Sequence, residues 1–364
     1  MLEHKSYFSR NNFDFVRLIA AAQVMITHGI EFLGVKISPF WNFIYYFPGV
    51  PAFFFISGFL ISASWERAEY LRLFAINRVL RIFPGLWLVF FFSLATILIF
   101  DKSFVPQQHI GGLILWSIGQ LTILQDWNPS FFRSYGAGVV NGSLWTIPVE
   151  LMFYASTPLI YWIGRKLKNI DLALIVIIVL SFAFQYWMML TKQQQGPFVH
   201  QLLEATPIPW IGMFCVGVLA QRHIGRIYPL VAGRFWYFLA TYIAFAVLSA
   251  YLPYYPLLRG RLNSVGMLNY IAMIGLILAT AYSYRGLADR VLRRNDISYG
   301  VYIFHMPVVN VLIAIGAVGM AGLGWEIAAT ILCAALSWTF VERRALALRT
   351  RALYRRTADN SGSA

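Results

Sequence analysis

Apolar segments of bilayer-spanning length follow one another along almost the whole chain, and this pattern limits what the chain can fold into. A helix needs about 17–25 mostly apolar residues to cross a bilayer. Runs near that length occur at 13–33, 41–64, 83–100, 144–163, 171–190, 207–221, 235–251, 266–283, 297–316 and 323–341. Backbone groups that face lipid must find their hydrogen bonds within the segment itself, so each run predicts a helix. The sequence therefore predicts an all-α integral membrane protein with about ten transmembrane helices.

Composition agrees with this interpretation and argues against a nucleic-acid partner. Hydrophobic residues make up 59% of the 364 residues and charged residues only 12%, about half the charged fraction of a soluble domain. The formal charge of +14 is spread over short gaps between the apolar runs, so it forms no single basic surface. The two cysteines, Cys215 and Cys333, each lie inside an apolar run, and no cluster resembles a metal site. We expect the lipid bilayer as a partner, no nucleic acid and no metal.

The positions of the Lys and Arg residues predict the orientation of the helices. Basic clusters fall in alternate gaps, as the positive-inside rule requires if both termini are cytoplasmic. An eleventh crossing within 111–124 would reverse this alternation for every later loop, so that stretch is predicted to be an interfacial or re-entrant helix. We expect a transmembrane domain at 1–342 and a cytoplasmic tail at 343–364, which is basic, then polar and disordered at its end. The predicted location is the cell membrane, as a multi-pass protein.

Two ionisable residues share the first predicted helix, and such residues inside a membrane mark functional sites by default. Arg17 and His28 are eleven residues apart, which is roughly three helical turns, so both side chains lie on one face about 16 Å apart. The outward direction of this helix places Arg17 near the cytoplasmic surface and His28 deeper. The alternative is an arginine that reaches the interface and a histidine that is buried and hydrogen-bonded.

A second basic element precedes the third predicted helix, where Asn77 is followed by Arg78 and Arg81 at positions i and i+3 of one face. The planar guanidinium group suits bidentate binding of phosphate. Together with Arg17, these arginines predict an anion site at the cytoplasmic surface. Ordinary positive-inside anchoring is the alternative for any single pair.

Glu150 and His305 are the remaining ionisable candidates. Glu150 follows Asn141-Gly142, a turn signal, and Ser143, which is expected to cap the next helix. It lies roughly 9 Å below the outer surface, close to the predicted depth of His28, so the two could face each other as a base and its orienting carboxylate. A structural partner on another helix is the alternative for Glu150. His305 is expected near mid-membrane, either in a local structural role before Pro307 or lining an acceptor or acyl tunnel.

These residues occur in an order that resembles the acyltransferase-3 family of membrane acyltransferases, over roughly residues 11–342. The elements that carry the resemblance are Arg17-x10-His28, Arg78-x-x-Arg81, Trp145-x4-Glu150 and Ser298-Tyr299 with His305. The resemblance implies transfer of an acyl group, usually acetyl, from acyl-CoA to a hydroxyl of a glycan or glycolipid. It assigns the essential histidine to His28 and acyl-CoA binding to Arg17, Arg78 and Arg81. Some members carry an additional hydrolase-like domain after the helices, but only 343–364 follow here, so we expect the stand-alone form, in the inner membrane if the cell is Gram-negative.

Motifs and resemblance together predict a mechanism in which CoA phosphates bind the arginines and acetyl-CoA serves as co-substrate. His28 would act as general base, with Glu150 fixing its tautomer, or would form a covalent acyl-histidine. The other candidate site residues are Asn77, Ser143, Trp145, Tyr154, Tyr299 and His305. The alternatives are a transporter or flippase of a lipid-linked glycan, in which His28 relays protons, and a glycan polymerase or ligase. The expected acceptor is a cell-surface polysaccharide, lipopolysaccharide or related glycan at the outer face of the membrane.

Overall fold

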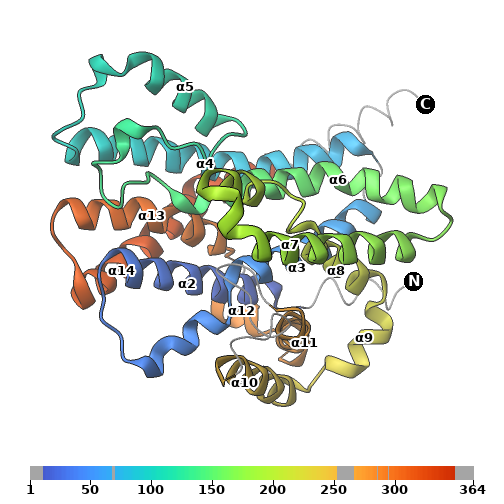
Figure 1. Ribbon diagram of the computed structural model, residues 1–364. Coiled ribbons are helices and arrows are strands. Elements are labelled where there is room, and N and C mark those ends of the chain that lie inside the picture. The colour runs from blue at the N-terminus through green and yellow to red at the C-terminus, as the bar shows by residue number, and fades with distance from the viewer. Residues whose placement is uncertain (1–10, 68–69, 252–265, 285, 294, 349–364) are drawn as a thin grey trace. The chain divides into compact units, whose positions relative to one another are not determined.

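A computed structural model describes residues 11–67, 70–251, 266–284, 286–293 and 295–348. Every element within these ranges is helical, as Figure 1 shows. The longer helices are α2 (Phe13–Phe32), α3 (Gly49–Arg67), α4 (Leu71–Phe100), α6 (Thr146–Lys166), α7 (Ile170–Glu204), α10 (Phe235–Tyr251), α11 (Met267–Ser283), α13 (Ser298–Ala314) and α14 (Gly319–Ser337). The all-α prediction is therefore confirmed for the described part of the chain.

Shorter helices connect these elements. They are η1 (Pro39–Tyr46), η2 (Pro106–Gln108), α5 (Ile110–Leu121), η3 (Ser130–Phe132), η4 (Gly142–Trp145), α8 (Ile211–Arg222), α9 (Ile224–Val231), α12 (Leu287–Leu292) and the π-helical η5 (Trp338–Glu342). The predicted interfacial or re-entrant segment corresponds to α5. Its 12 residues extend about 18 Å, which is less than the roughly 30 Å of a hydrocarbon core.

Each of the ten predicted runs coincides with a helix, but fewer pass a combined test of length and hydropathy. Within the described residues, five helices do so: Phe13–Phe32, Phe43–Arg67, Leu71–Phe100, Ile170–Thr191 and Gly319–Leu348. A sixth is possible if Ile224–Val231 and Phe235–Ser249, which meet at 89°, form one broken span. The number of crossings and the cytoplasmic position of both termini therefore stay predictions.

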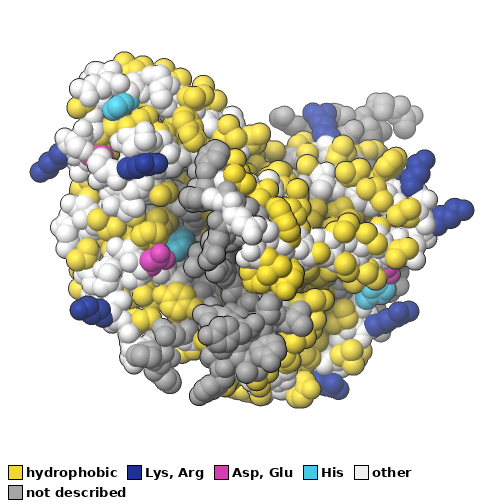
Figure 2. All heavy atoms as spheres, in the orientation of Figure 1, with side chains coloured by type: hydrophobic (Ala, Val, Ile, Leu, Met, Phe, Trp, Pro, Cys, Tyr) yellow, Lys and Arg dark blue, Asp and Glu magenta, His cyan; other side chains and the backbone are white. Residues whose placement is uncertain are grey.

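Exposed apolar side chains support a multi-pass membrane protein. Trp236 is 71% exposed and Ile99 is 68% exposed. A wide area of such exposed apolar side chains would be unfavourable in water. Hydrophobic side chains cover much of the face in Figure 2, where Lys and Arg side chains are few and separate. Such a surface is stable when lipid tails surround it.

The chain divides into two compact units. The first contains residues 1–24, 37–66 and 148–296, and the second contains 25–36, 67–147 and 297–364. In the first unit, α3 and α8 cross closely: a Cβ atom on Gly58 would lie 1.9 Å from the carbonyl oxygen of Phe214, so only glycine allows this approach. Aromatic rings surround the crossing, with Phe153 stacked on Phe214 at 4.9 Å between centroids.

In the second unit, α13 packs against both α4 and α14. Its residues are almost completely buried. The segment before η4 is fixed to α13 by Asn310, whose side-chain nitrogen donates to the carbonyls of Val139 and Val140 at 3.0 and 2.9 Å. The residues just before η4 are therefore held against this helix.

The predicted domain boundary at 342 falls inside a helical stretch. The last span passes through η5 and reaches Leu348. The first residues of the predicted tail thus continue the helix, and the end of the tail, which is expected to be disordered, lies outside the described residues.

Candidate active site

His28 and His305 form a direct pair in the second unit. Nδ1 of His28 lies 2.9 Å from Nε2 of His305, and the ring centroids are 5.1 Å apart. His305 has no exposed surface, whereas His28 is partly exposed. The pair therefore consists of an accessible imidazole supported by one that is fully buried. Sequence reasoning named both residues but did not pair them.

The hydrogen bonds of the pair determine which nitrogen atoms carry protons. Nδ1 of His305 lies 3.3 Å from the carbonyl oxygen of Val301, and a carbonyl can only accept. A neutral His305 therefore holds its proton on Nδ1 and accepts at Nε2, so Nδ1 of His28 must donate to it. Nε2 of a neutral His28 is then left with a lone pair. This arrangement suits a general base at the accessible ring.

Tyr302 and the segment around η4 hold α13 in place. The hydroxyl of Tyr302 donates to the carbonyl of Ser143 at 3.0 Å and lies 2.9 Å from the hydroxyl of Thr146. Asn141 donates to the carbonyl of Ile303 at 2.8 Å. Ser143 does not cap α6, contrary to the prediction, because its hydroxyl lies 2.7 Å from Oδ1 of Asn141 and 3.2 Å from the carbonyl oxygen of Tyr302. Its role is to join two segments of the unit.

The predicted Arg-x-x-Arg element lies on α4. Arg81 packs over the rings of Tyr299 and Trp338, each 6.0 Å from its guanidinium carbon, and Arg78 packs over Phe74. The hydroxyl of Tyr299 donates to the carbonyl of Ile82 at 2.9 Å, which fixes α13 to α4 at this level. Aromatic faces orient a guanidinium group while leaving its N–H edges for other partners.

Asn77, also on α4, is 7% exposed, and its Oδ1 has no hydrogen-bond partner among the described residues. Trp145 is half-buried at the end of η4. Neither residue contacts the histidine pair through a described hydrogen bond. Both stay candidates only by their place in the sequence motifs.

Three predicted site residues belong to the first unit: Arg17, Glu150 and Tyr154. Arg17 forms an ion pair with Asp296, with 2.9 Å between Nη1 and Oδ2. Glu150 accepts hydrogen bonds from the hydroxyls of Ser57, at 3.0 Å, and Tyr154. Because these residues and the histidine pair lie in different units, the expected approach of Glu150 to His28 and of Arg17 to the other arginines stays a prediction.

Asp296 was missed by the sequence analysis. The signal that could have identified Asp296 is its position directly before an apolar run, in a chain with few acidic residues. No group of three or more His, Cys, Asp or Glu side chains in the described ranges could hold a metal ion.

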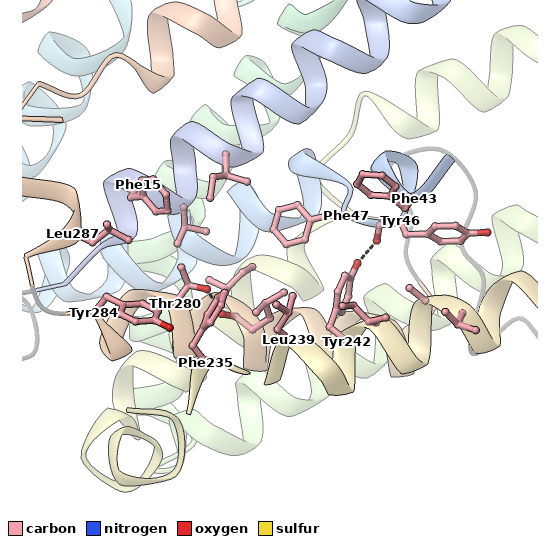
Figure 3. Close-up of a pocket in the computed structure, with 17 residues that line it drawn as sticks. Phe15, Phe43, Tyr46, Phe47, Phe235, Leu239, Tyr242, Thr280, Tyr284 and Leu287 are labelled. Atoms are coloured by element: carbon pink, nitrogen blue, oxygen red, sulfur yellow. Dashed lines mark hydrogen bonds between the residues drawn. The ribbon is translucent and has the colours of Figure 1, made fainter. Parts of the chain in front are cut away.

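The first unit also contains an apolar cavity of about 720 Å³. Figure 3 shows its walls, which include Phe15 from α2, Phe47 and Phe235, and the hydroxyl of Tyr242 donates to the carbonyl of Tyr46 beside it. The described lining residues are almost entirely hydrocarbon and include no Lys or Arg, so the cavity suits an apolar chain better than the phosphates of CoA.

Comparison with known proteins decides the family. A family described as the acyltransferase domain matches residues 10–342. The chain belongs to the acyltransferase-3 family.

Similarity to individual proteins extends over nearly the full length. The chain is 34% identical to Nodulation protein 10 of Rhizobium leguminosarum bv. viciae, over 97% of this chain and 98% of that protein. It is 27% identical to the O-acetyl transferase of Shigella phage Sf6, over 94% of this chain and 97% of that protein. No solved structure matches the chain. The histidine pair therefore lies within the region that matches the acyltransferase family.

Proposed function

We propose that this acyltransferase moves an acetyl group from acetyl-CoA to a hydroxyl of a cell-surface glycan at the outer face of the membrane. The observation that carries the proposal is the His28–His305 pair, which leaves a basic nitrogen on a partly exposed ring. The similarity to a phage O-acetyl transferase supports acetyl as the group and a hydroxyl as the acceptor.

The donor is proposed to enter from the cytoplasm. Ten crossings with both termini inside place Arg17, Arg78 and Arg81 at the cytoplasmic surface, where the positive-inside rule puts most basic residues. The CoA phosphates bind there, and the pantetheine arm reaches along α2. Arg17 and His28 are about 16 Å apart along this helix, so the thioester arrives near His28. In a Gram-negative cell the membrane is the inner one.

The proposed reaction needs one base and returns its proton. Nε2 of His28 takes the proton from the acceptor hydroxyl while the oxygen attacks the thioester carbonyl. A C–O bond forms, the C–S bond breaks, and His28 gives the proton to the leaving thiolate to yield free CoA. His305 keeps the donor Nδ1–H of His28 oriented throughout, and Glu150 adds negative charge at the depth of His28.

The test uses purified protein in detergent with radiolabelled acetyl-CoA and a glycan fraction from the cell surface. Labelled glycan and free CoA are expected in equal amounts. His28→Ala should remove both products, and His109→Ala is the matched control because His109 stacks on Phe131, at 4.6 Å between centroids, away from the pair in sequence. Labelled glycan from the His28→Ala protein would refute the proposal.

The proposed orientation is tested without any activity. Single cysteines, introduced after Cys215 and Cys333 are replaced by alanine, are labelled from outside with a membrane-impermeant reagent. Positions in 101–143 should react, and positions in 65–82 and 284–296 should react only after the membrane is opened. Outside labelling of 284–296 would change the number of crossings after residue 110 by one.

A further inference from the structure

Glu326 is a buried carboxylate that neither the sequence motifs nor the proposed mechanism uses. It lies on α14, has no exposed surface, and neither of its oxygen atoms has a hydrogen-bond partner among the described residues. Thr330, one helical turn further on, is also fully buried, and its hydroxyl likewise has no described partner. Residues four apart share one helical face. One face of α14 therefore carries two buried polar side chains that have no described hydrogen-bond partner.

The carboxylate lies directly against the backbone next to His28. A Cβ atom on Gly29 would be 1.8 Å from Oε2 of Glu326 and 2.7 Å from Leu323. Any side chain at position 29 would therefore displace the carboxylate. Glycine at this position lets Glu326 reach the helix that carries the base.

The packing of α13 against α14 brings the face of α14 that carries Glu326 and Thr330 to the level of His305. The two helices form a hairpin, and a Cβ atom on Gly300 would lie 2.8 Å from the Cα atom of Ala334. From this crossing, Thr330 is about 6 Å along α14 and His305 about 7.5 Å along α13. The hydroxyl of Thr330 and the buried imidazole of His305 thus lie at nearly the same depth. Glu326 lies one helical turn further along α14.

We propose that Glu326 is a positioning residue of the His28–His305 pair and that its carboxylate balances the positive charge that forms on His28 during acyl transfer. An ionised carboxylate buried without a partner is strongly unfavourable. The cost of an ionised Glu326 falls when His28, the residue next to Gly29, becomes positively charged by taking the proton of the acceptor hydroxyl. The inference rests on the proposed function, since it needs His28 to accept a proton.

The decisive variant is Glu326→Gln, which keeps the shape and removes the charge. The turnover number should fall at least about tenfold, a part of the 10²–10⁴-fold that acid–base catalysis contributes, while KM for acetyl-CoA stays unchanged. Glu326→Asp, which keeps the charge on a shorter arm, should retain more turnover than the glutamine variant. A residue that only fills space would show the reverse order, because glutamine matches its volume better.

The matched control is Glu342→Gln. Glu342 is 1% exposed, belongs to the same helical stretch and accepts a hydrogen bond from Ser337 at 2.7 Å, so turnover per folded molecule should not change. If Glu326→Gln does not accumulate as folded protein, Gly29→Ala decides the question. It displaces the carboxylate without altering its charge, and full turnover in that variant would overturn the inference.

The outcomes separate this inference from the proposed function. A wild-type protein that transfers no acetyl group refutes the function itself. A wild-type protein that is active, with an inactive His28→Ala variant and normal turnover in Glu326→Gln, refutes only the role of Glu326. Combined with normal turnover in Glu326→Gln, a selective fall of turnover in Glu150→Gln would assign the balancing charge to Glu150 alone.

Discussion

Two polar clusters of this protein differ in how completely their charges are paired. The paired cluster, in the first unit, joins the ends of α3 and α8 to the start of α7. Asp171 binds Arg222 and His223 at 2.8 Å each, while Glu66 accepts from Tyr161 and Gln221 at 2.9 Å each. Both carboxylates thus have partners on both oxygen atoms.

The relay cluster, in the second unit, consists of His28, His305, Glu326 and Thr330. Its two imidazoles bind each other, but Glu326 and Thr330 have no described partners, and all members except His28 are fully buried. Buried polar groups are normally hydrogen-bonded, and exceptions often have a catalytic role. Under the proposed function, the paired cluster uses its charges for structure and the relay cluster keeps its polar groups for chemistry.

The largest effect is expected from His28→Ala in the relay cluster. Loss of the base should lower the turnover number by about 10²–10⁴-fold and leave expression and folding normal. His305→Phe should have a smaller but still large effect, because His28 loses the acceptor that orients it. Turnover assays and thermal melting on the same purified samples measure both. A fully active His28→Ala protein would place the chemistry outside this cluster.

Glu150 lies outside both clusters. Its substitution tests whether a carboxylate that already has hydrogen-bond partners can also act in catalysis. Its partners Ser57 and Tyr154 suggest that a glutamine would keep its position. If Glu150 supplies charge to His28, Glu150→Gln should lower turnover by about 10²-fold or more with acetyl-CoA binding unchanged. If Glu150 is structural, the melting temperature should fall while turnover per folded molecule stays near normal.

The arginines should act on the donor and not on the chemical step. Each charge-assisted contact is worth about 1.5–3 kcal/mol, so loss of Arg17, Arg78 or Arg81 should raise KM for acetyl-CoA by roughly 10- to 150-fold. Lysine should restore part of the affinity, since the charge remains but the bidentate geometry does not. An unchanged KM in all three alanine variants would leave these residues a purely topological role.

The smallest effect is expected in the paired cluster. The side chains of Arg222 and Asp171 are 26% and 33% exposed, and such ion pairs contribute about 1 kcal/mol or less. Arg222→Ala should lower the melting temperature by a few degrees and leave turnover and KM unchanged. A selective loss of turnover would contradict the distinction between the two clusters.

The sequence identified His28 and His305, but it predicted Glu150 as the partner of His28 and named no partner for His305. Intramembrane ionisable residues are rare, so the two histidines were conspicuous in apolar runs. The hydrogen bond between them joins residues 277 positions apart, a contact that no local pattern encodes. The rule that identified His28 applies equally to Glu326 in the run 323–341, and that residue was overlooked.

The sequence by itself determined the helical class, the membrane setting and the family, because bilayer thickness and backbone hydrogen bonding leave few options for long apolar runs. It also determined which residues can carry charge or protons. Only the tertiary structure decided which of them meet. The pairing of His28 with His305, of Arg17 with Asp296, and the contact of Glu326 with Gly29 depend on helix packing. Packing is set by many side chains far apart in the sequence, and a single glycine admits the carboxylate beside the base.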